Sequence, residues 1–315
     1  MHGMCRHMPC AGRVAATRYP GSVTTPPSIR AVGILSPGEM GSGVGEVLHH
    51  HGLRVLTCLA GRGPGSRERA ARAGFEDTPD LEALVSACDI VLSIVPPAVA
   101  GAVADQVGSA VRATGADLLY ADCNAIAPGT ARAVAQTITE AGARFADAGI
   151  IGPPPTRPGN RIFTSGPGAQ ELSILGSYGL DIRVLDGEVG QASGLKMCYA
   201  AMTKGLQALG AELLVAARLL GVESQLRAEQ NQGGDLVAVR RFVESALPSM
   251  PPKAYRWIGE MEEIARCFED LGLPGRLMRG AADVYTDFRD GGVLARELPL
   301  DRPARNSAGG RIPSN

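Results

Sequence analysis

A short apolar run followed at once by a glycine-containing turn and a helix-forming segment constrains the fold of this chain most. Residues 29–35, with the sequence IRAVGIL, predict a buried parallel strand. The run breaks at Ser36-Pro37-Gly38, and residues 40–51 continue as a helix that begins with small residues. A helix N-terminus directly after such a turn offers unpaired N–H groups and a positive dipole end. The stretch therefore predicts the phosphate-binding corner of a dinucleotide-binding fold, the alternative being an ordinary glycine-rich loop in a parallel sheet.

We expect the phosphates of a dinucleotide to meet the residues of this corner. Gly38 lets the backbone approach the phosphates, and Gly41 lets the helix pack close to the strand. The residues expected to line this part of the cofactor site are Ser36, Gly38, Glu39, Met40 and Gly41.

The end of the second predicted strand carries cations where NAD-specific proteins usually carry an acid. Arg62 follows this strand, and Ser66 and Arg67 come shortly after it. A carboxylate would repel a 2′-phosphate, whereas Arg62 and Arg67 could hold one by charge-assisted hydrogen bonds. NADP is therefore the favoured cofactor, unless these arginines are simply solvated on the next helix, as we expect of Arg69 and Arg72.

Strand-like and helix-like segments alternate through the first 190 residues. The further strands are expected at 53–59, 89–95, 117–121, 144–148, 162–165 and 182–185, and further helices at 81–87, 98–112 and 128–141. This alternation predicts an α/β fold with a doubly wound parallel sheet, which binds ligands at the carboxyl ends of its strands. Val95 and Pro96 follow one such end, so we expect them beside the cofactor. Asn124 follows another, where it could bind a substrate carboxylate or hydroxyl, or form an Asx turn.

A long and almost uncharged helix is predicted over residues 191–220. Its apolar positions alternate steps of four and three, at 195, 199, 202, 206, 209, 213, 216 and 220. We expect this helix to be buried on most sides, to join two domains and to pack against a partner subunit. The chain after it, to about residue 290, predicts helices interrupted by prolines.

The domain organisation follows from the length of 315 residues, which favours two domains. We expect a disordered extension over 1–28 (alternatively a basic transit peptide), a Rossmann-like dinucleotide-binding domain over 29–188, and an all-helical substrate and dimerisation domain over 189–290. A disordered polar tail is expected over 291–315.

Composition excludes several classes of protein. The net charge of −1 gives no electrostatic footprint for nucleic acid, and no apolar run is long enough to span a membrane. The seven cysteines form no C-x-x-C pair, which favours a reducing, cytoplasmic environment. The three histidines at 49–51 point about 100° apart around a helix, so no metal site is expected.

Four motifs, in order, resemble those of the β-hydroxyacid dehydrogenase superfamily, which includes 3-hydroxyisobutyrate and 6-phosphogluconate dehydrogenases. The Gly-Leu-Gly-x-Met-Gly motif is similar to residues 36–41, Asp-x-Ser-Thr with a following Pro to 122–128, and Asp-Ala-Pro-Val-Ser-Gly-Gly to 147–153. The fourth motif, a Gly and then a Lys with an Asn four residues later, resembles Gly190 and Lys196, but position 200 is Ala. Residues 252–263 look like a distinct C-terminal domain in a less characterised branch of the superfamily.

The resemblance implies that Lys196 is the acid–base group. A lysine performs this role near neutral pH only if burial or a neighbouring cation lowers its pKa, and Lys196 lies in an otherwise apolar helix. Because Ala200 replaces the Asn of the family, the orienting role could pass to Tyr199 or Asn124. The alternative without a catalytic role is that the Lys196 side chain extends to solvent.

The expected function is that of an NADP-dependent oxidoreductase that transfers a hydride between nicotinamide and a small β-hydroxy acid or its carbonyl counterpart. Imine reduction on the same fold is one alternative, and a non-catalytic NADP-binding sensor is another. The expected partners are a small-molecule substrate and a second copy of the chain, forming a homodimer through the helical domain.

Overall fold

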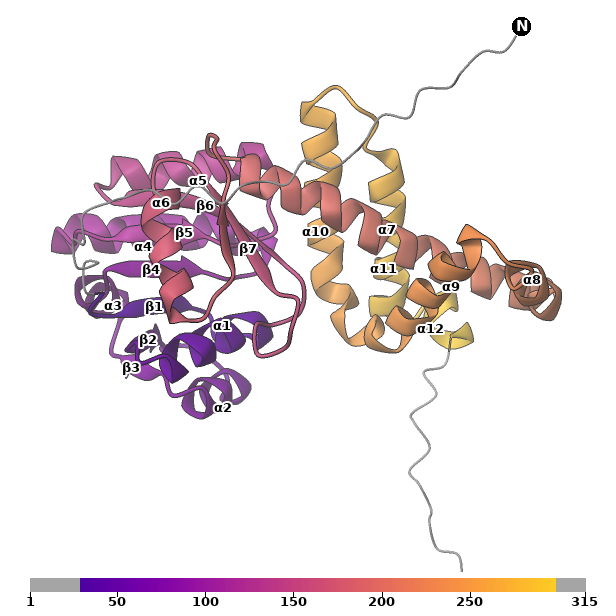
Figure 1. The fold of residues 1–315 in the computed structure, drawn as a ribbon, viewed down its shortest axis with the longest axis horizontal. Coiled ribbons are helices and arrows are strands. Elements are labelled where there is room, and N and C mark those ends of the chain that lie inside the picture. Colours follow the sequence, from indigo (N-terminus) through magenta and orange to yellow (C-terminus); the bar gives the residue numbers. More distant parts are fainter. Residues whose placement is uncertain (1–28, 299–315) are drawn as a thin grey trace, which may run out of the picture.

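An eight-stranded, mostly parallel sheet with helices on both faces is followed by an all-helical region in the computed structural model, which describes residues 29–298 (Figure 1). The strand order is β3-β2-β1-β4-β5-β6-β7-β8. The strands are β1 (Val32–Leu35), β2 (Val55–Cys58), β3 (Glu76–Thr78), β4 (Ile90–Ser93), β5 (Leu119–Asp122), β6 (Arg144–Ile151), β7 (Arg161–Ser165) and β8 (Ile182–Val184). The predicted doubly wound, Rossmann-like sheet is confirmed.

Helices cover the two faces of this sheet and bury separate apolar clusters. The helices of the sheet region are α1 (Glu39–His50), α2 (Pro64–Arg72), α3 (Leu81–Ala87), α4 (Ala100–Thr114), α5 (Pro128–Glu140) and α6 (Ala169–Leu172), with short 3₁₀ turns η1 (Pro97–Val99) and η2 (Ser173–Tyr178). One cluster joins α3, α4 and α5 to the sheet, and the other joins α1, α6 and η2 to it. β1 and β4 are neighbours in the sheet although they are not consecutive in the chain. In folds of this kind the ligand crevice lies at the carboxyl ends of two such strands.

Two features of the sheet differ from the prediction. β7 pairs antiparallel with β6, because only residues 152–160 connect them and a parallel crossover needs a dozen residues or more. The third strand, β3, was not predicted, because it has three residues and exposes two of them.

The helical region begins with the 29-residue helix α7 (Gln191–Leu219), which leaves the sheet and crosses α10 and α11 (Figure 1). The other helices are α8 (Glu223–Gln230), α9 (Asp235–Ala246), α10 (Ala254–Asp270), α11 (Arg276–Asp290) and α12 (Val293–Glu297), with 3₁₀ turns η3 (Leu247–Ser249) and η4 (Pro251–Lys253). The breaks predicted at the prolines of this region are confirmed.

Asp147 of β6 anchors the start of α7. Its buried carboxylate accepts hydrogen bonds from the Gly190 and Ser193 backbone N–H groups, at 2.9 and 3.1 Å, and from the Ser193 and Ser165 hydroxyls. A carboxylate at a helix N-terminus also meets the positive end of the helix dipole. The long helix is therefore fixed to the sheet at a specific point.

A second buried carboxylate joins the helical region to the sheet region. Glu263 of α10 accepts hydrogen bonds from the Ala127 backbone N–H at 2.7 Å and from the Thr130 hydroxyl at 2.9 Å. These donors lie at the start of α5, so Glu263 supplies the cap that Ala127, which has an apolar side chain, cannot.

The burial predicted for α7 is wrong in its direction. The residues that α7 buries include Met197, Ala200, Ala208 and Ala211, which pack in the cluster shared with α10 and α11. The predicted apolar positions lie on another side of the helix and are exposed or only partly covered. The buried face of α7 thus combines small residues, which let α10 and α11 approach closely, with Met197, Leu214 and Val215.

The chain ends also bear on the predicted domains. Residues 291–298, expected to be disordered, contain α12, which starts after Gly291 in a left-handed conformation and is capped by Asp287 through the Val293 and Leu294 N–H groups. The predicted extension 1–28 and the tail from 299 lie outside the described residues. None of the helices described is both long and apolar enough to cross a membrane.

Candidate active site

The turn between β1 and α1 has a backbone geometry that only a few residue types tolerate. Ser36 has φ of 71°, in the left-handed region that favours glycine, and Gly38 donates its N–H to the Ser36 carbonyl at 2.8 Å. A Cβ at Gly41 would lie 2.6 Å from the Ser36 carbonyl oxygen. The helix therefore packs as closely on the turn as the sequence predicts, and Ser36 takes a strained position where the family motif has Gly.

The start of α1 fits the pyrophosphate of a dinucleotide. Gly38 is the N-cap, no side chain caps the helix, and a Cβ at Gly38 would meet nothing within 4 Å. The first-turn N–H groups thus face open space, as an anion site requires. Glu39 in the same turn is paired with Arg157 at 4.0 Å and Arg256 at 3.5 Å, which offsets its negative charge.

Asn160 contributes a buried acceptor beside this corner. Its side-chain nitrogen donates to the Pro153 carbonyl at 2.6 Å and lies 4.0 Å from the sulfur of Met40. Its side-chain oxygen is buried and has no hydrogen-bond partner among the described residues. A buried acceptor without a partner costs free energy, so an amide or hydroxyl donor of a ligand would be stabilised there.

The loop after β2 is organised by its arginines. Arg67 donates to the carbonyls of Leu59 and Arg62, at 2.7 and 3.2 Å, while Arg62 itself is exposed. Arg69, expected to be solvated, is half-buried and donates to the Pro37 carbonyl at 2.8 Å, because α2 lies against the glycine turn. It also donates to the Ser66 hydroxyl at 3.3 Å.

An acidic side chain that the sequence analysis did not single out lies beside this loop. Asp77 of β3 accepts a hydrogen bond from the Leu59 backbone N–H at 2.8 Å. An arginine and a carboxylate are therefore both present near the expected ribose position. Of Arg62, Arg67 and Arg69, only Arg62 has a side chain that donates no hydrogen bond to the backbone of the described residues.

Asn124 links two strand ends at the crevice. Its side-chain oxygen accepts from the Val95 N–H at 2.7 Å, and its side-chain nitrogen donates to Ser93 and Asp122, at 3.1 and 2.9 Å. An Asx turn is present here, but it is formed by Asp122, whose carboxylate accepts the Asn124 backbone N–H at 2.9 Å, and not by the Asn124 side chain as the alternative had it. These bonds use both amide hydrogens, and a direct substrate contact by Asn124 stays a prediction.

The crevice carboxylate Asp122 is easily protonated. Burial raises the pKa of Asp122 to about 7, even though hydrogen bonds from Asn124 favour its charged form. Val95 is buried at the end of this segment and Pro96 is exposed, and both follow β4 at the predicted position.

Lys196 lies where α7 touches the carboxyl-terminal half of β6. Its amine donates to the Ile150 carbonyl at 2.5 Å, and its side chain is half-buried. A Cβ at Gly149 would lie 2.7 Å from the Ala192 carbonyl and 3.1 Å from Cβ of Lys196, so glycine permits this close contact. The Lys196 side chain therefore contacts the backbone near the end of β6 directly.

A second lysine and a glutamate complete a charged cluster around Lys196. Lys204, two turns further along α7, is ion-paired with Glu260 of α10. Burial, as the largest cause, and the Lys204 cation together lower the pKa of Lys196 to about 8, although the Glu260 carboxylate opposes the change. Although burial alone would raise it, Lys204 and Lys196 keep the pKa of Glu260 below its usual value. The predicted burial and neighbouring cation are thus both present, and the alternative that Lys196 extends to solvent is wrong.

Tyr199 and Ala200 do not complete this cluster. Tyr199 is 46% exposed and is one of the predicted apolar positions of α7 that the chain leaves uncovered. Ala200 is buried against α10 and α11. Among the described residues no hydrogen bond joins the Tyr199 side chain to Lys196, and its orienting role stays a prediction. Trp257 packs edge-on against Tyr285, with ring centroids 5.2 Å apart, and the centroid of its ring lies 5.7 Å from the Lys204 amine.

Lys204 and Glu260 are the site residues that the sequence reasoning missed or undervalued. Nothing in the local sequence places Glu260, 56 residues away, against Lys204. One compositional signal was available: the chain has only three lysines, Lys196, Lys204 and Lys253, among its 31 basic residues. An arginine cannot release its proton near neutral pH, so each lysine in so arginine-rich a chain is a candidate for proton transfer.

Two family models match the chain. The NAD binding domain of 6-phosphogluconate dehydrogenase matches residues 31–170, which contain the glycine turn and the crevice. A domain of unknown function, DUF1932, matches residues 217–288 of the helical region.

Individual relatives agree with these matches. An uncharacterized 28.5 kDa protein of Methanothermus fervidus is 31% identical over 236 residues, covering 74% of this chain and 89% of that protein. A solved structure of a conserved protein of unknown function, reported to be structurally similar to 3-hydroxyacid dehydrogenases, is 32% identical with a TM-score of 0.61 and covers 85% of this chain and 98% of its own. Mycobacterium tuberculosis 3-hydroxyisobutyrate dehydrogenase shares the fold, with 20% identity, a TM-score of 0.65 and coverage of 87% and 100%.

Proposed function

Since this chain belongs to the superfamily of β-hydroxyacid and 6-phosphogluconate dehydrogenases, in a branch that carries a DUF1932 domain, we propose that it is an NADP-dependent oxidoreductase. Its substrate would be a small β-hydroxy acid or the corresponding carbonyl compound. The Rossmann fold for NAD(P) is shared with the dehydrogenases, whereas the reaction and the choice of NADP are the proposal.

The observation that carries this proposal is the position of the Lys196 amine. Its pKa is lowered to about 8, and it lies at the carboxyl-terminal half of β6. This fold binds its ligands at the carboxyl ends of its strands. A group with a pKa near the working pH can both accept and return a proton efficiently.

The proposed roles of the chain follow from these positions. When bound, the nicotinamide ring supplies the hydride acceptor or donor. In the direction of oxidation, the Lys196 amine takes the substrate hydroxyl proton while the hydride leaves the same carbon, so that a carbonyl and an ammonium group result. In the reverse direction the Lys196 ammonium returns that proton to the oxygen.

The charged neighbours have supporting roles in this scheme. Glu260 and Lys204 set the field at Lys196 without being consumed, because their charges pair with each other. Arg256, which pairs with Glu39 at 3.5 Å and is only one-third exposed, is the guanidinium of α10 offered to a substrate carboxylate.

The same structure supports particular residues for the cofactor. We assign the pyrophosphate to the first-turn N–H groups of Glu39, Met40 and Gly41, and the Asn160 side-chain oxygen to an amide or hydroxyl of the dinucleotide. NADP is favoured because the Arg62 guanidinium is exposed beside the loop, while the Asp77 carboxylate is already bonded to the Leu59 N–H.

A substrate panel tests the reaction. Hydroxy acids, semialdehydes and cyclic imines are assayed with NADPH/NADP and with NADH/NAD, using wild type, Lys196→Ala and, as a matched control, Lys253→Ala. We expect turnover of a hydroxy acid or semialdehyde, a loss of 100-fold or more in kcat for Lys196→Ala, and no comparable loss for Lys253→Ala. Full turnover by Lys196→Ala refutes its role, turnover of imines alone favours an imine reductase, and cofactor binding without any turnover favours a sensor.

Cofactor choice is tested separately by binding. We expect Arg62→Ala to weaken NADPH binding about tenfold and to leave NADH binding unchanged, since only NADPH carries the 2′-phosphate. Tighter binding of NADH by the wild type, or equal effects on both cofactors, would reject this assignment.

A further inference from the structure

Helix α10 lies across the carboxyl ends of neighbouring strands and is anchored there at two points (Figure 1). Arg256 pairs with Glu39 of α1, the helix that follows β1. Glu263 accepts a hydrogen bond from the Ala127 N–H at the start of α5, the helix that follows β5. In the sheet β4 lies between β1 and β5, and the turn η1 that follows β4 contacts α10. The helix therefore passes over the ends of β1, β4 and β5 in that order.

Gly259 is the residue of α10 that lies over the end of the middle strand. Steps of three and four residues place Arg256, Gly259 and Glu263 on one side of the helix, so Gly259 lies between the two anchors and over η1. It is half-buried, yet a Cβ at Gly259 would meet no atom within 4 Å among the described residues outside its own part of the helix. Pro96 and Val99 are exposed although α10 contacts the turn that they flank and end. A space thus remains between α10 and the end of β4.

The glycine at this position has a cost that packing does not explain. In a helix interior, glycine is less favourable than alanine because it loses more backbone freedom on folding. Other helix glycines are required by a neighbour: a Cβ at Gly210 of α7 would collide with Val243. Gly259 has no such neighbour, so the absence of its side chain preserves the space itself. Glycine is used in this way where a ligand approaches the backbone closely.

The cofactor is the ligand whose path crosses this space. Its pyrophosphate is assigned to the first turn of α1, and a dinucleotide in this fold lies across the crevice at the strand ends. To reach Lys196 at the end of β6, the nicotinamide half must extend from α1 past the end of β4 and under α10. We propose that α10 covers the nicotinamide half of bound NADP and that Gly259 leaves the room for it. This inference rests on the proposed binding of NADP and not on the proposed reaction.

The substrate belongs on another side of α10. Glu260 directly follows Gly259, and successive residues point about 100° apart around a helix. The Glu260 charge acts on Lys196, so a substrate held between Lys196 and Arg256 lies on the Glu260 side. The space at Gly259 is therefore left to the nucleotide.

Substitutions of increasing size at Gly259 test this assignment. The full-length protein is titrated calorimetrically with NADPH and with adenosine 2′,5′-bisphosphate, a fragment that lacks the nicotinamide half; if wild type prefers NADH, NADH and adenosine monophosphate replace this pair. We expect Gly259→Ala to weaken NADPH binding about threefold and Gly259→Leu about 30-fold or more, while the fragment binds both variants as tightly as wild type.

Gly280→Leu is the matched control. Gly280 lies inside α11, is exposed, and also has open space around the position of a Cβ, so its substitution should change neither affinity. Because alanine and leucine favour a helix more than glycine does, the melting temperature of each variant should be at or above that of wild type, which verifies folding.

The outcomes separate this inference from the proposed function. Equal NADPH binding by wild type and Gly259→Leu overturns the inference and leaves the binding of NADP intact. A loss that affects the adenosine fragment as much as NADPH also overturns it, because the adenosine half does not lie under α10. A wild type that binds neither NADPH nor NADH refutes the proposed function, and this inference falls with it.

Discussion

The charged cluster on α7 and α10 makes a prediction that needs neither substrate nor cofactor. Because the chain has only three lysines, protein labelled with ¹³C at the lysine ε-carbons should give three signals, whose shifts report the protonation of each amine. We expect the signal of Lys196 to titrate with a pKa of about 8, well below the ordinary value of 10.5. That difference corresponds to about 3 kcal/mol against the charged form, at about 1.4 kcal/mol per unit.

Two substitutions should move this pKa in opposite directions. Glu260→Gln removes the carboxylate charge that favours the ammonium form of Lys196, so the pKa of Lys196 should fall below 8. Lys204→Met removes the opposing cation, so the pKa of Lys196 should rise. A unit charge a few ångströms away contributes about 2–4 kcal/mol at an effective dielectric constant near 20. At about 1.4 kcal/mol per unit of pKa, the loss of one such charge corresponds to a shift of about 1.5 to 3 units, in opposite directions for the two variants.

The controls use residues in the same helices. Lys196→Met identifies the Lys196 signal by its loss, and Glu262→Gln removes an exposed carboxylate of α10 and should leave the Lys196 titration unchanged. If the reaction is as proposed, kcat for oxidation should rise with pH through about 8, because the neutral amine is the base, and the midpoint should follow the two variants. A Lys196 that titrates near 10.5, or that shifts in the same direction in both variants, would refute the reasoning.

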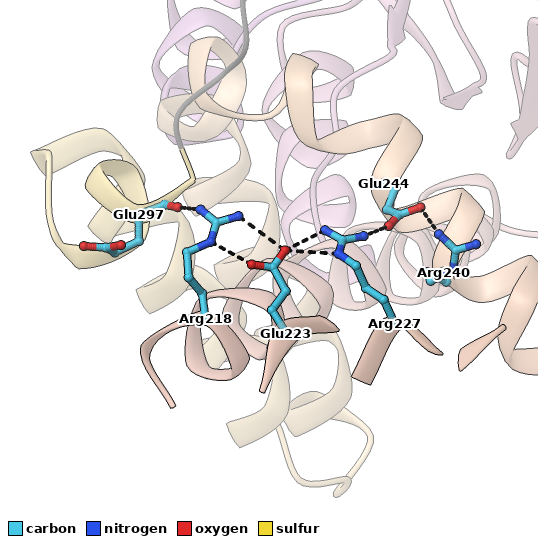
Figure 2. A network of polar contacts seen from close by, with 6 residues as sticks. All are labelled: Arg218, Glu223, Arg227, Arg240, Glu244 and Glu297. Atoms are coloured by element: carbon cyan, nitrogen blue, oxygen red, sulfur yellow. Dashed lines mark hydrogen bonds and ion pairs between the residues drawn. The ribbon is translucent and has the colours of Figure 1, made fainter. Parts of the chain in front are cut away.

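Two further predictions concern stability. Asp147→Asn should lower the free energy of unfolding by about 3 kcal/mol in urea denaturation, because the buried carboxylate that accepts four hydrogen bonds at the start of α7 is lost, whereas the exposed Asp181→Asn should change it by less than about 0.5 kcal/mol. An equal effect of the two would contradict the anchoring role. Glu223 lies between Arg218 and Arg227 in a chain of ion pairs that continues to Glu244 and Arg240 (Figure 2), and side-chain hydrogen bonds from these two arginines lower the pKa of Glu223 to about 2. Because the pKa of Glu223 is depressed in the folded protein, its contribution to the free energy of unfolding is complete above pH 4.5 and is lost as the pH falls toward 2. The urea midpoint of Glu223→Gln should therefore lie below that of wild type at pH 7 and converge with it in acid. A difference that stays constant with pH would argue against this.

Local patterns were sufficient for the glycine corner and for the sheet. The turn at Ser36 to Gly41 is specified by consecutive residues, so the backbone constraint can be read from the chain itself. The alternation of segments then predicts a parallel, doubly wound sheet, although it does not give the strand order that the structure shows. Even here a short connection, residues 152–160, reversed the direction of β7, and length was the only clue to it.

The burial of α7 shows why periodicity is a weaker guide than it looks. The spacing from Leu195 to Leu220 correctly identifies an apolar face, but a pattern does not state what covers that face. Inside the chain, alanines such as Ala208 and Ala211 permit close helix packing and so take the internal contact. The apolar face with large side chains is left for another partner.

Charges brought together by the tertiary fold are further beyond the reach of sequence. Lys196 was identified through a motif, but the ion pair of Lys204 with Glu260 beside it exists only because α10 packs on α7. Asn124 illustrates the converse, since its place after a strand suggested a ligand contact and the structure shows it bonded to Val95, Ser93 and Asp122.

The distribution of charge in the cluster explains why one of its two lysines is suited to proton transfer. A single carboxylate, Glu260, cannot neutralise two ammonium groups, and it is ion-paired with Lys204. Lys196 instead donates to a neutral carbonyl, that of Ile150, so burial dominates and lowers its pKa. Arginine at position 204 could still oppose the ammonium of Lys196, but arginine at position 196 could not release a proton at all. The chemistry thus requires an amine at 196 and only a cation at 204, and Lys204→Arg should preserve the titration of Lys196 that Lys204→Met shifts.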